Sequence, residues 1–178
     1  MQTIFETERL LAGVWDPPRH APAAFAIYGD PEVTRTIGGD TVPDVDALAT
    51  RMREALKRYA GYGAPFCWAP LFRKEDAALV GAALLKPLPD ANLQPTPDIE
   101  VGWHLARAWW GHGYATEAGR ALIARGFAHL DVDTLHAVVD PGNTRSEAVA
   151  RRCGMTHAGR TSRWYGKRLE HYLIHRPV

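Results

Sequence analysis

The sequence predicts a mixed α/β (α+β) fold, in which helices pack on one central sheet. Its 178 residues are enough to bury a core without disulfides or a structural metal. The composition, with 46% hydrophobic and 23% charged residues, is that of a globular protein rather than a disordered one. The order of the predicted elements mixes hairpins with strand–helix units, and no repeat or linker interrupts it. We therefore expect a single domain over residues 1–178.

Charge and targeting signals exclude several classes of protein. Twenty-one basic and twenty acidic residues leave a net charge of +1, so no global field attracts the chain to nucleic acid or to an anionic membrane. The first residues lack the pattern of a signal peptide, and no run of roughly eighteen apolar residues occurs. Cys67 and Cys153 share no metal-ligand spacing. We expect a cytoplasmic monomer or homodimer without a nucleic-acid, membrane or metal partner.

The N-terminal segment predicts one strand and two short helices. Arg9–Trp15 mixes apolar and small residues as a strand does, and the prolines that follow Asp16 end it. A helix then extends to Tyr28. Asp30 has the position of an N-cap before a proline, which begins the second helix, and a glycine pair at Gly38 closes it.

The middle of the chain predicts a longer helix and a hairpin. In Asp44–Ala60 apolar residues recur every three or four positions, which predicts an amphipathic helix. Two apolar runs, Pro65–Phe72 and Ala78–Leu85, flank a charged turn and are expected to pair as strands. The proline-rich stretch Pro87–Pro97 is expected to be a loop.

In the second half strands and helices alternate. Thr144 and Glu147 have the spacing of a capping box, and Gly154 is a stop signal for the helix they begin. The predicted helices are Thr116–Leu130 and the segment from Thr144 to Cys153, and the predicted strands are Ile99–Leu105, Leu135–Val139, Ser162–Tyr165 and Leu169–His175.

A loop with two glycines, Gly111 and Gly113, joins strand Ile99–Leu105 to the helix that follows it. Glycines let the backbone approach a ligand closely, and the free amides at a helix start favour an anion, so the loop is a candidate phosphate cradle. A tight turn without a ligand is the alternative. A dinucleotide fingerprint needs a third glycine where Thr116 stands, and the Lys-Ser/Thr of a kinase-type phosphate loop is absent.

Several blocks taken together resemble the GNAT acetyltransferases, most closely the branch of the ribosomal-protein alanine N-acetyltransferases RimJ and RimL. The blocks are Thr7–Leu10, Gly29–Val33, Ile99–Leu105, Trp110–Ala118, Asn143–Ser146 and Arg152–Met155. The resemblance implies a mixed, mostly antiparallel, twisted sheet of about six to seven strands flanked by helices. It also implies that the sheet splays between strands Ile99–Leu105 and Leu135–Val139.

The resemblance further implies an acetyl-CoA-dependent N-acetyltransferase. Acetyl-CoA is then the cosubstrate, and the acceptor is a primary amine, of a protein N-terminus or a small molecule, that attacks the thioester directly. A non-catalytic acyl-CoA-binding protein on the same scaffold is the alternative. The implied coenzyme-binding residues are His104, Leu105, Ala106, Trp109, Trp110, Gly111, His112, Gly113, Tyr114, Ala115, Asn143 and Ser146.

Catalytic residues are less clearly marked. By the match Glu100 is a candidate general base, because a strand carboxylate lining an apolar gap has a raised pKa, and a structural carboxylate is the alternative. Many relatives place a tyrosine, which acts as an acid toward the leaving thiolate, where this chain has Ala150. Ser146 is therefore the candidate for the group that contacts the sulfur, and an exposed helix residue without a role is the alternative. Trp68 and Tyr165 are candidate acceptor-binding residues, or else core aromatics. Relatives often have Arg or Gln where Ala108 stands.

Overall fold

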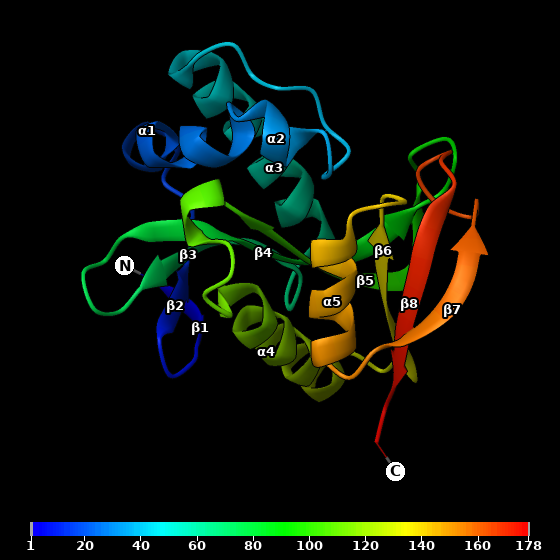
Figure 1. Cartoon of the computed structure of the whole chain (residues 1–178). Helices are drawn as coiled ribbons and strands as arrows, with labels where there is room; N and C mark the ends of the chain where they lie inside the picture. Colours follow the sequence, from blue (N-terminus) through cyan, green and yellow to red (C-terminus); the bar gives the residue numbers. More distant parts are fainter. Residues whose placement is uncertain (1, 178) are drawn as a thin grey trace.

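The computed structural model describes residues 2–177, which form an eight-stranded sheet with helices on both faces (Figure 1). The strand order is β1-β2-β3-β4-β5-β6-β8-β7, and every neighbouring pair is antiparallel except β5 and β6. The strands are β1 (Thr3–Glu6), β2 (Leu10–Gly13), β3 (Cys67–Arg73), β4 (Leu79–Pro89), β5 (Pro95–Leu105), β6 (Thr134–Val139), β7 (Thr156–Thr161) and β8 (Leu169–His175).

The sheet divides the core into two layers, and each layer is covered by one group of helices. Helices α1 (Pro17–Tyr28), α2 (Pro31–Thr34) and α3 (Val45–Tyr62) lie on one face of the sheet, and α4 (Tyr114–His129) and α5 (Thr144–Arg152) lie on the other (Figure 1). The first layer buries an apolar cluster that includes residues of α1 and α3, and the second buries the apolar stripe of α4. Such amphipathic helices are stabilised mainly by the face that they bury on the sheet.

Strands β5 and β6 diverge, as the resemblance predicted. They pair only where Ile99 meets Leu135 and Glu100 meets His136. Beyond Glu100, β5 continues to pair with β4 as far as Leu105, but within residues 2–177 no strand pairs with its other edge. The sheet is therefore open on one edge of β5, between α4 and α5 on one side and α1 to α3 on the other.

Two expectations are corrected. One is the number of strands, expected to be six to seven, and the other is the proline-rich loop. The chain has an additional N-terminal strand, β1, and the stretch Pro87–Pro97 extends the β4–β5 hairpin instead of forming a loop. β3 reaches only as far as Leu85 of β4, so the prolines beyond it remove no ladder hydrogen bond on that side. Asp90 closes the hairpin by accepting hydrogen bonds from the amides of Asn92 and Gln94.

The predicted strand Ser162–Tyr165 is also wrong. The penultimate strand is β7, Thr156–Thr161, and the residues after it turn back toward β8. β7 lies at the edge of the sheet with mostly exposed side chains, so it has no alternating apolar pattern for a sequence to reveal. Among residues 2–177, no helix is long and apolar enough to cross a membrane.

Candidate active site

The loop before α4 presents a row of unused backbone donors. Gly111 and Gly113 have φ angles of +82° and +83°, which a residue with a side chain rarely adopts, and Gly113 is the N-cap of α4. The backbone N–H groups of residues 111–116 donate to no acceptor within the described part of the chain. Six consecutive donors at a helix N-terminus form a site that suits a phosphate group.

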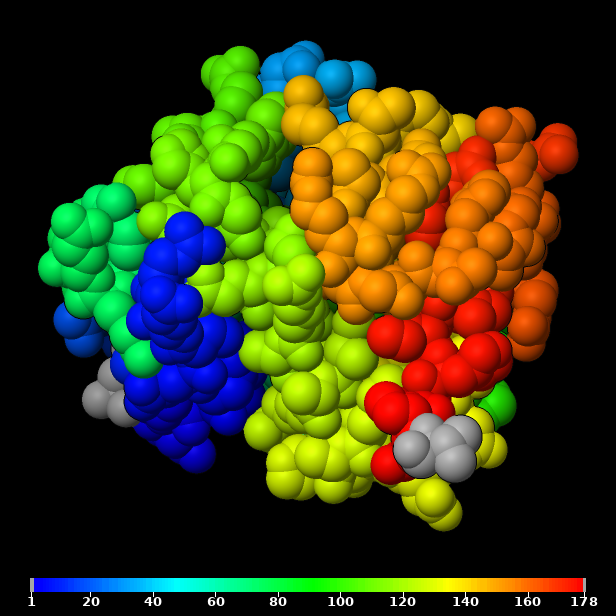
Figure 2. Space-filling view, turned by 60° about the horizontal axis from the view of Figure 1, so that its bottom comes forward, coloured from blue at the N-terminus to red at the C-terminus, as the bar shows by residue number. Residues whose placement is uncertain are grey.

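The N-terminal segment holds this loop in place from behind. Thr7 Oγ1 and the Arg9 amide donate to one carboxylate oxygen of Glu117, in the first turn of α4, and Arg9 Nε donates to the other over 2.7 Å. Arg9 also donates to the carbonyl oxygen of His112 over 3.1 Å. Burial opposes ionisation of Glu117, but the hydrogen bonds from Thr7 and Arg9 outweigh it and keep its pKa below the usual value. Figure 2 shows the N-terminal segment (blue) packed against the yellow-green region that contains α4.

Two tryptophans fix the shape of the loop. Trp110 Nε1 donates to the carbonyl oxygen of Leu105 over 3.0 Å, so this ring ties the loop to the end of β5. The guanidinium of Arg145, at the start of α5, lies 4.0 Å from the centre of the same ring. Trp109 lies against Arg73 in the same manner, at 4.6 Å. Arg145 thus places positive charge beside the free amides, which favours an anionic ligand, whereas the charge of Arg73 is paired with Asp76 and Glu75.

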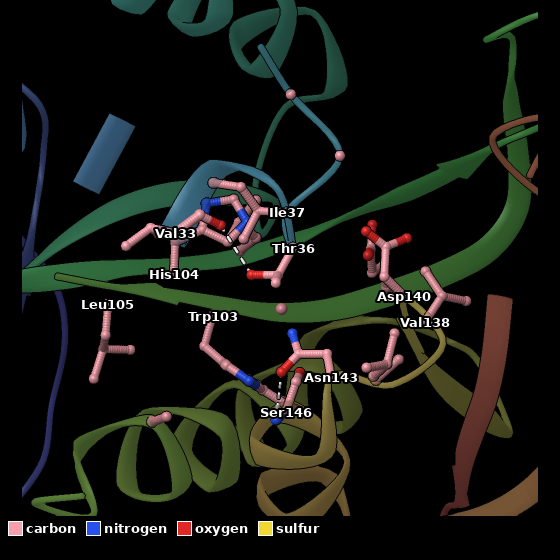
Figure 3. A pocket seen from close by; sticks show the side chains of 18 of the residues that line it. Val33, Thr36, Ile37, Trp103, His104, Leu105, Val138, Asp140, Asn143 and Ser146 are labelled. Atoms are coloured by element: carbon pink, nitrogen blue, oxygen red, sulfur yellow. Dashed lines mark hydrogen bonds between the residues drawn. The ribbon is translucent and has the colours of Figure 1, made fainter. Parts of the chain in front are cut away.

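A cavity of about 950 Å³ connects this loop to the opposite face of the sheet. It begins at Gly111–Thr116, passes the gap between β5 and β6, and ends among aromatic residues of α3 and β3. Around the gap, Asn143 and Ser146 lie on the α5 side of β5, and His104 lies on the other side with residues of the α2 segment (Figure 3). The two halves of the cavity are therefore separated by β5 and joined through the open edge.

Glu100 is held at the inner end of the gap by two side chains. Lys86 Nζ lies 2.9 Å from Glu100 Oε2, and the Tyr165 hydroxyl donates to the same oxygen. Lys86 Nζ also donates to the Tyr165 oxygen over 2.6 Å. Oε1 of Glu100 has no hydrogen-bond partner in the described part of the chain. The carboxylate thus lies beside a cation, not in the purely apolar gap that was expected.

Tyr165 reaches this position from the turn between β7 and β8. Its φ angle is +59°, a left-handed conformation that is uncommon outside glycine. Burial and the adjacent negative charge of Glu100 raise the pKa of Tyr165 far above its ordinary value. A phenol with a raised pKa gives up its proton less readily, so this environment suits hydrogen bonding to an acceptor better than acid catalysis.

Most of the coenzyme, catalytic and acceptor residues expected from the sequence line the same cavity. Ser146 lies on the first turn of α5, where its amide donates to the Asn143 side chain over 3.2 Å. Two expected residues lie outside the lining. Ala106 uses its N–H to bond the carbonyl oxygen of Val80, and the exposed His112 bonds the carbonyl oxygen of Trp110 and stacks on Tyr114. The lining residues from the expected set are Trp68, Glu100, His104, Leu105, Trp109, Trp110, Gly111, Gly113, Tyr114, Ala115, Asn143, Ser146 and Tyr165.

Lys86, Arg145 and Tyr28 also line the cavity and contact expected site residues, but the sequence did not predict them. Lys86 is a single charged residue at the end of an apolar run in β4. Because a partly buried charge needs a partner, its presence in the sequence could have indicated a carboxylate nearby. Arg145 stands inside the recognised block Asn143–Ser146 and was available as a cation near the loop. The sequence marks Tyr28 only as the end of a helix, because its contact with His104 depends on the tertiary fold. Within residues 2–177 no group of three or more potential ligand side chains is arranged to hold a metal ion.

Comparisons with known proteins agree on one family. A family model described as "Acetyltransferase (GNAT) domain" matches residues 13–156. The chain is 28% identical over 146 residues to the uncharacterized N-acetyltransferase p20 of Bacillus licheniformis, which covers 82% of this chain and 78% of that protein. It is 40% identical over 66 residues to the uncharacterized protein YkkB of Bacillus subtilis, but this match spans only 37% of the chain and 38% of YkkB.

Solved structures with the same fold cover nearly the whole chain. An acetyltransferase from Agrobacterium tumefaciens strain C58 has a TM-score of 0.77 and 27% identity, covering 99% of this chain and 95% of that one. RimL, the ribosomal L7/L12 alpha-N-protein acetyltransferase solved with coenzyme A, has a TM-score of 0.76 over 98% of both chains, and at 15% identity this likeness concerns the fold. Together with the family match, the splayed sheet and the free amides before α4 confirm the family that the sequence blocks indicated. The chain belongs to the GNAT family of N-acetyltransferases.

Proposed function

We propose that this chain transfers the acetyl group of acetyl-CoA to a primary amine that enters from the α1–α3 face. The observation that carries the proposal is the continuous cavity from the amides of residues 111–116, through the gap between β5 and β6, to the Glu100 carboxylate. A donor and an acceptor bound at its two ends would meet at the open edge of β5. Such positioning of two reactants is a large part of the rate that an enzyme provides.

On the donor side, the amides of residues 111–116 would hold the pyrophosphate, with Arg145 adding positive charge. Their fit rests on the six unused N–H groups and on the two left-handed glycines that shape them. The unpaired edge of β5 beyond Glu100 would bind an extended arm as an added strand does. Acetyl-CoA supplies an acetyl group already activated as a thioester.

On the acceptor side, Glu100 would take the proton that the attacking amine loses. Lys86 and Tyr165 occupy Oε2 and fix the orientation of the carboxylate, which leaves Oε1 to receive the proton. Ser146 lies on the α5 side of the gap, where its hydroxyl would donate a hydrogen bond to the leaving sulfur. Its amide is held by Asn143, which positions the first turn of α5 for that contact.

The test is release of free thiol from acetyl-CoA in the presence of N-terminal peptides, amino acids, polyamines or aminoglycosides. We expect stoichiometric thiol and acetylated amine with at least one class. The double variant Gly111→Val/Gly113→Val should lose coenzyme binding, because β-branched residues are strained at these φ angles. Gly159→Val is the matched control, since Gly159 also has a positive φ but lies on β7, away from the cavity. Tight coenzyme binding without thiol release for any amine would show a binding protein and refute the proposal.

A further inference from the structure

Three side chains on the acceptor face form a chain of hydrogen bonds that ends at the cavity. Trp68 Nε1 donates to the Tyr28 hydroxyl oxygen over 3.0 Å, and that hydroxyl lies 3.3 Å from His104 Nδ1. An indole N–H can only donate, so the Tyr28 oxygen accepts there and its own hydrogen is available to another partner. Within the described part of the chain His104 Nδ1 is the one acceptor in reach of it. Donation from the Tyr28 hydroxyl to Nδ1 is the arrangement that satisfies this hydrogen, and in it the neutral imidazole of His104 carries its own proton on Nε2.

The imidazole of His104 is uncharged in this environment, and its Nε2 atom is left for a ligand. Burial, aided by the positive charge of Lys86, lowers the pKa of His104 to about 4. The side chain is partly exposed and lines the cavity, and its Nε2 has no hydrogen-bond partner among residues 2–177. Figure 3 shows the ring beside the apolar side chains of Val33 and Ile37. A donor in such surroundings favours a ligand that offers an acceptor, because covering it with an apolar group would leave it unsatisfied.

The position of His104 on the strand relates it to the proposed chemistry. Glu100, Gly102 and His104 alternate with the residues that face α4, so they share the acceptor face of β5. Gly102 has no side chain, which leaves room on this face between the other two. Residues two apart on a strand are separated by about 7 Å. An amine beside Gly102 would thus have Glu100 on one side and His104 about one or two peptide units away on the other.

We propose that the Nε2–H of His104 is a specificity-determining donor, which selects amines that carry a carbonyl or carboxylate oxygen near the nitrogen. The inference rests on the proposed function, because it assumes an amine acceptor in this half of the cavity. It assigns His104 a role different from that of a base, since Nε2 already holds the proton. Tyr28 and Trp68 are positioning residues that act through His104 by fixing its tautomer.

The test compares two amines of similar shape, leucinamide and 3-methylbutylamine, which lacks the carboxamide. The variant His104→Phe keeps a ring and removes the donor. We expect the ratio of kcat/KM for leucinamide to that for 3-methylbutylamine to fall by about 3- to 10-fold, the value of one hydrogen bond, with the KM for acetyl-CoA unchanged. Dividing the ratio in the variant by that in the wild type cancels the different basicities of the amines. His129→Phe, at an exposed position of α4, is the matched control and should leave the ratio unchanged.

Nitrogen-15 NMR of the imidazole rings tests the tautomer without any turnover. We expect the His104 ring of the wild type to be protonated at Nε2, and Tyr28→Phe to admit the Nδ1-protonated form. An Nδ1-protonated ring in the wild type would overturn the proposal, as would an unchanged substrate ratio in His104→Phe. Absence of thiol release with every amine would instead refute the proposed function. In that case saturating leucinamide must still shift the His104 Nε2 resonance, and no shift would overturn the proposal.

Discussion

Replacement of Gly102 by alanine should separate the stability of the fold from the shape of the cavity. A methyl group at this position would lie 3.6 Å from Leu84 Cβ and Cδ1, which is ordinary contact, with no closer atom. The φ angle of Gly102 is outside the left-handed region, so alanine is compatible with the backbone. Because alanine restricts the unfolded chain more than glycine does, we expect the free energy of unfolding to rise by about 0.4–1 kcal/mol. For a chain of this size that corresponds to a Tm increase of about 1–4 °C.

The same methyl group should reduce activity. It would project from β5 into the cavity, between the side chains of Glu100 and His104, where the acceptor amine is proposed to bind. Overfilling a packed site costs about 1–3 kcal/mol, which lowers kcat/KM for the amine by about 5- to 150-fold. The affinity for coenzyme A should change little, since the cradle at residues 111–116 is untouched.

Gly61→Ala supplies the matched control for this variant. Gly61 is exposed on α3, a methyl group there would meet no atom within 4 Å, and the residue does not line the cavity. It should show a similar gain in Tm by differential scanning calorimetry and unchanged kcat/KM. Equal activity of the Gly102 and Gly61 variants would refute the assignment of this wall. A lower Tm for Gly102→Ala would show that the methyl group disturbs the sheet instead.

Three further predictions concern pH, the cradle and the base. Burial, aided by the adjacent His136, lowers the pKa of His171 to about 4, so the unfolded state binds more protons than the folded state between about pH 4 and pH 7. The free energy of unfolding, measured by urea titration, should therefore fall as the pH is lowered from 7 to 5. In His171→Phe this fall should be smaller by about 2 kcal/mol. An equal fall in both proteins would contradict the assignment. Arg9→Gln should loosen Glu117 and raise the Kd for coenzyme A, measured by calorimetry, whereas Arg19→Gln, the same charge change at an exposed position, should not. Glu100→Gln should lower kcat by about 100-fold or more at unchanged coenzyme affinity, and a kcat near that of the wild type would exclude Glu100 as the base.

The loop end of the cavity could be predicted from the sequence because its residues are consecutive in the chain. Gly111 and Gly113 lie within one loop, and the backbone donors that they shape belong to the residues between strand and helix. Such a loop depends on positive φ angles and on the start of a helix. Both can be recognised from residues that are adjacent in the sequence. Thr7 and Arg9 belong to a block noted only for its resemblance to the family, and their hydrogen bonds to Glu117 arise from the tertiary fold.

The surroundings of Glu100 could not be predicted from the sequence, because the residues that contact it come from different strands and turns of the fold. Glu100 and Tyr165 are 65 positions apart, and Lys86 joins them from a third element. The sequence suggested an apolar surrounding for Glu100, since nothing in the spacing reveals that register places Lys86 directly opposite on β4. Tyr165 was expected on a strand, yet it lies in the turn between β7 and β8, where it has a left-handed conformation.

The proline-rich hairpin shows how a reliable local rule is overridden. Prolines argue against a central strand because they cannot donate to a ladder. Here the hairpin extends beyond the reach of β3, so Pro87 and Pro89 occupy positions with one fewer neighbouring strand. Whether a proline is tolerated therefore depends on the length of a strand elsewhere in the sheet, which the local sequence does not contain.

Amide NMR of the isotopically labelled protein during titration with coenzyme A tests the central claim most directly. If the free N–H groups of residues 111–116 hold the pyrophosphate, their resonances should shift most at saturation, followed by those of the open edge of β5. Resonances of β7, which lies at the far edge of the sheet, should remain in place. Saturable binding of coenzyme A that leaves the amides of residues 111–116 unshifted would contradict the account.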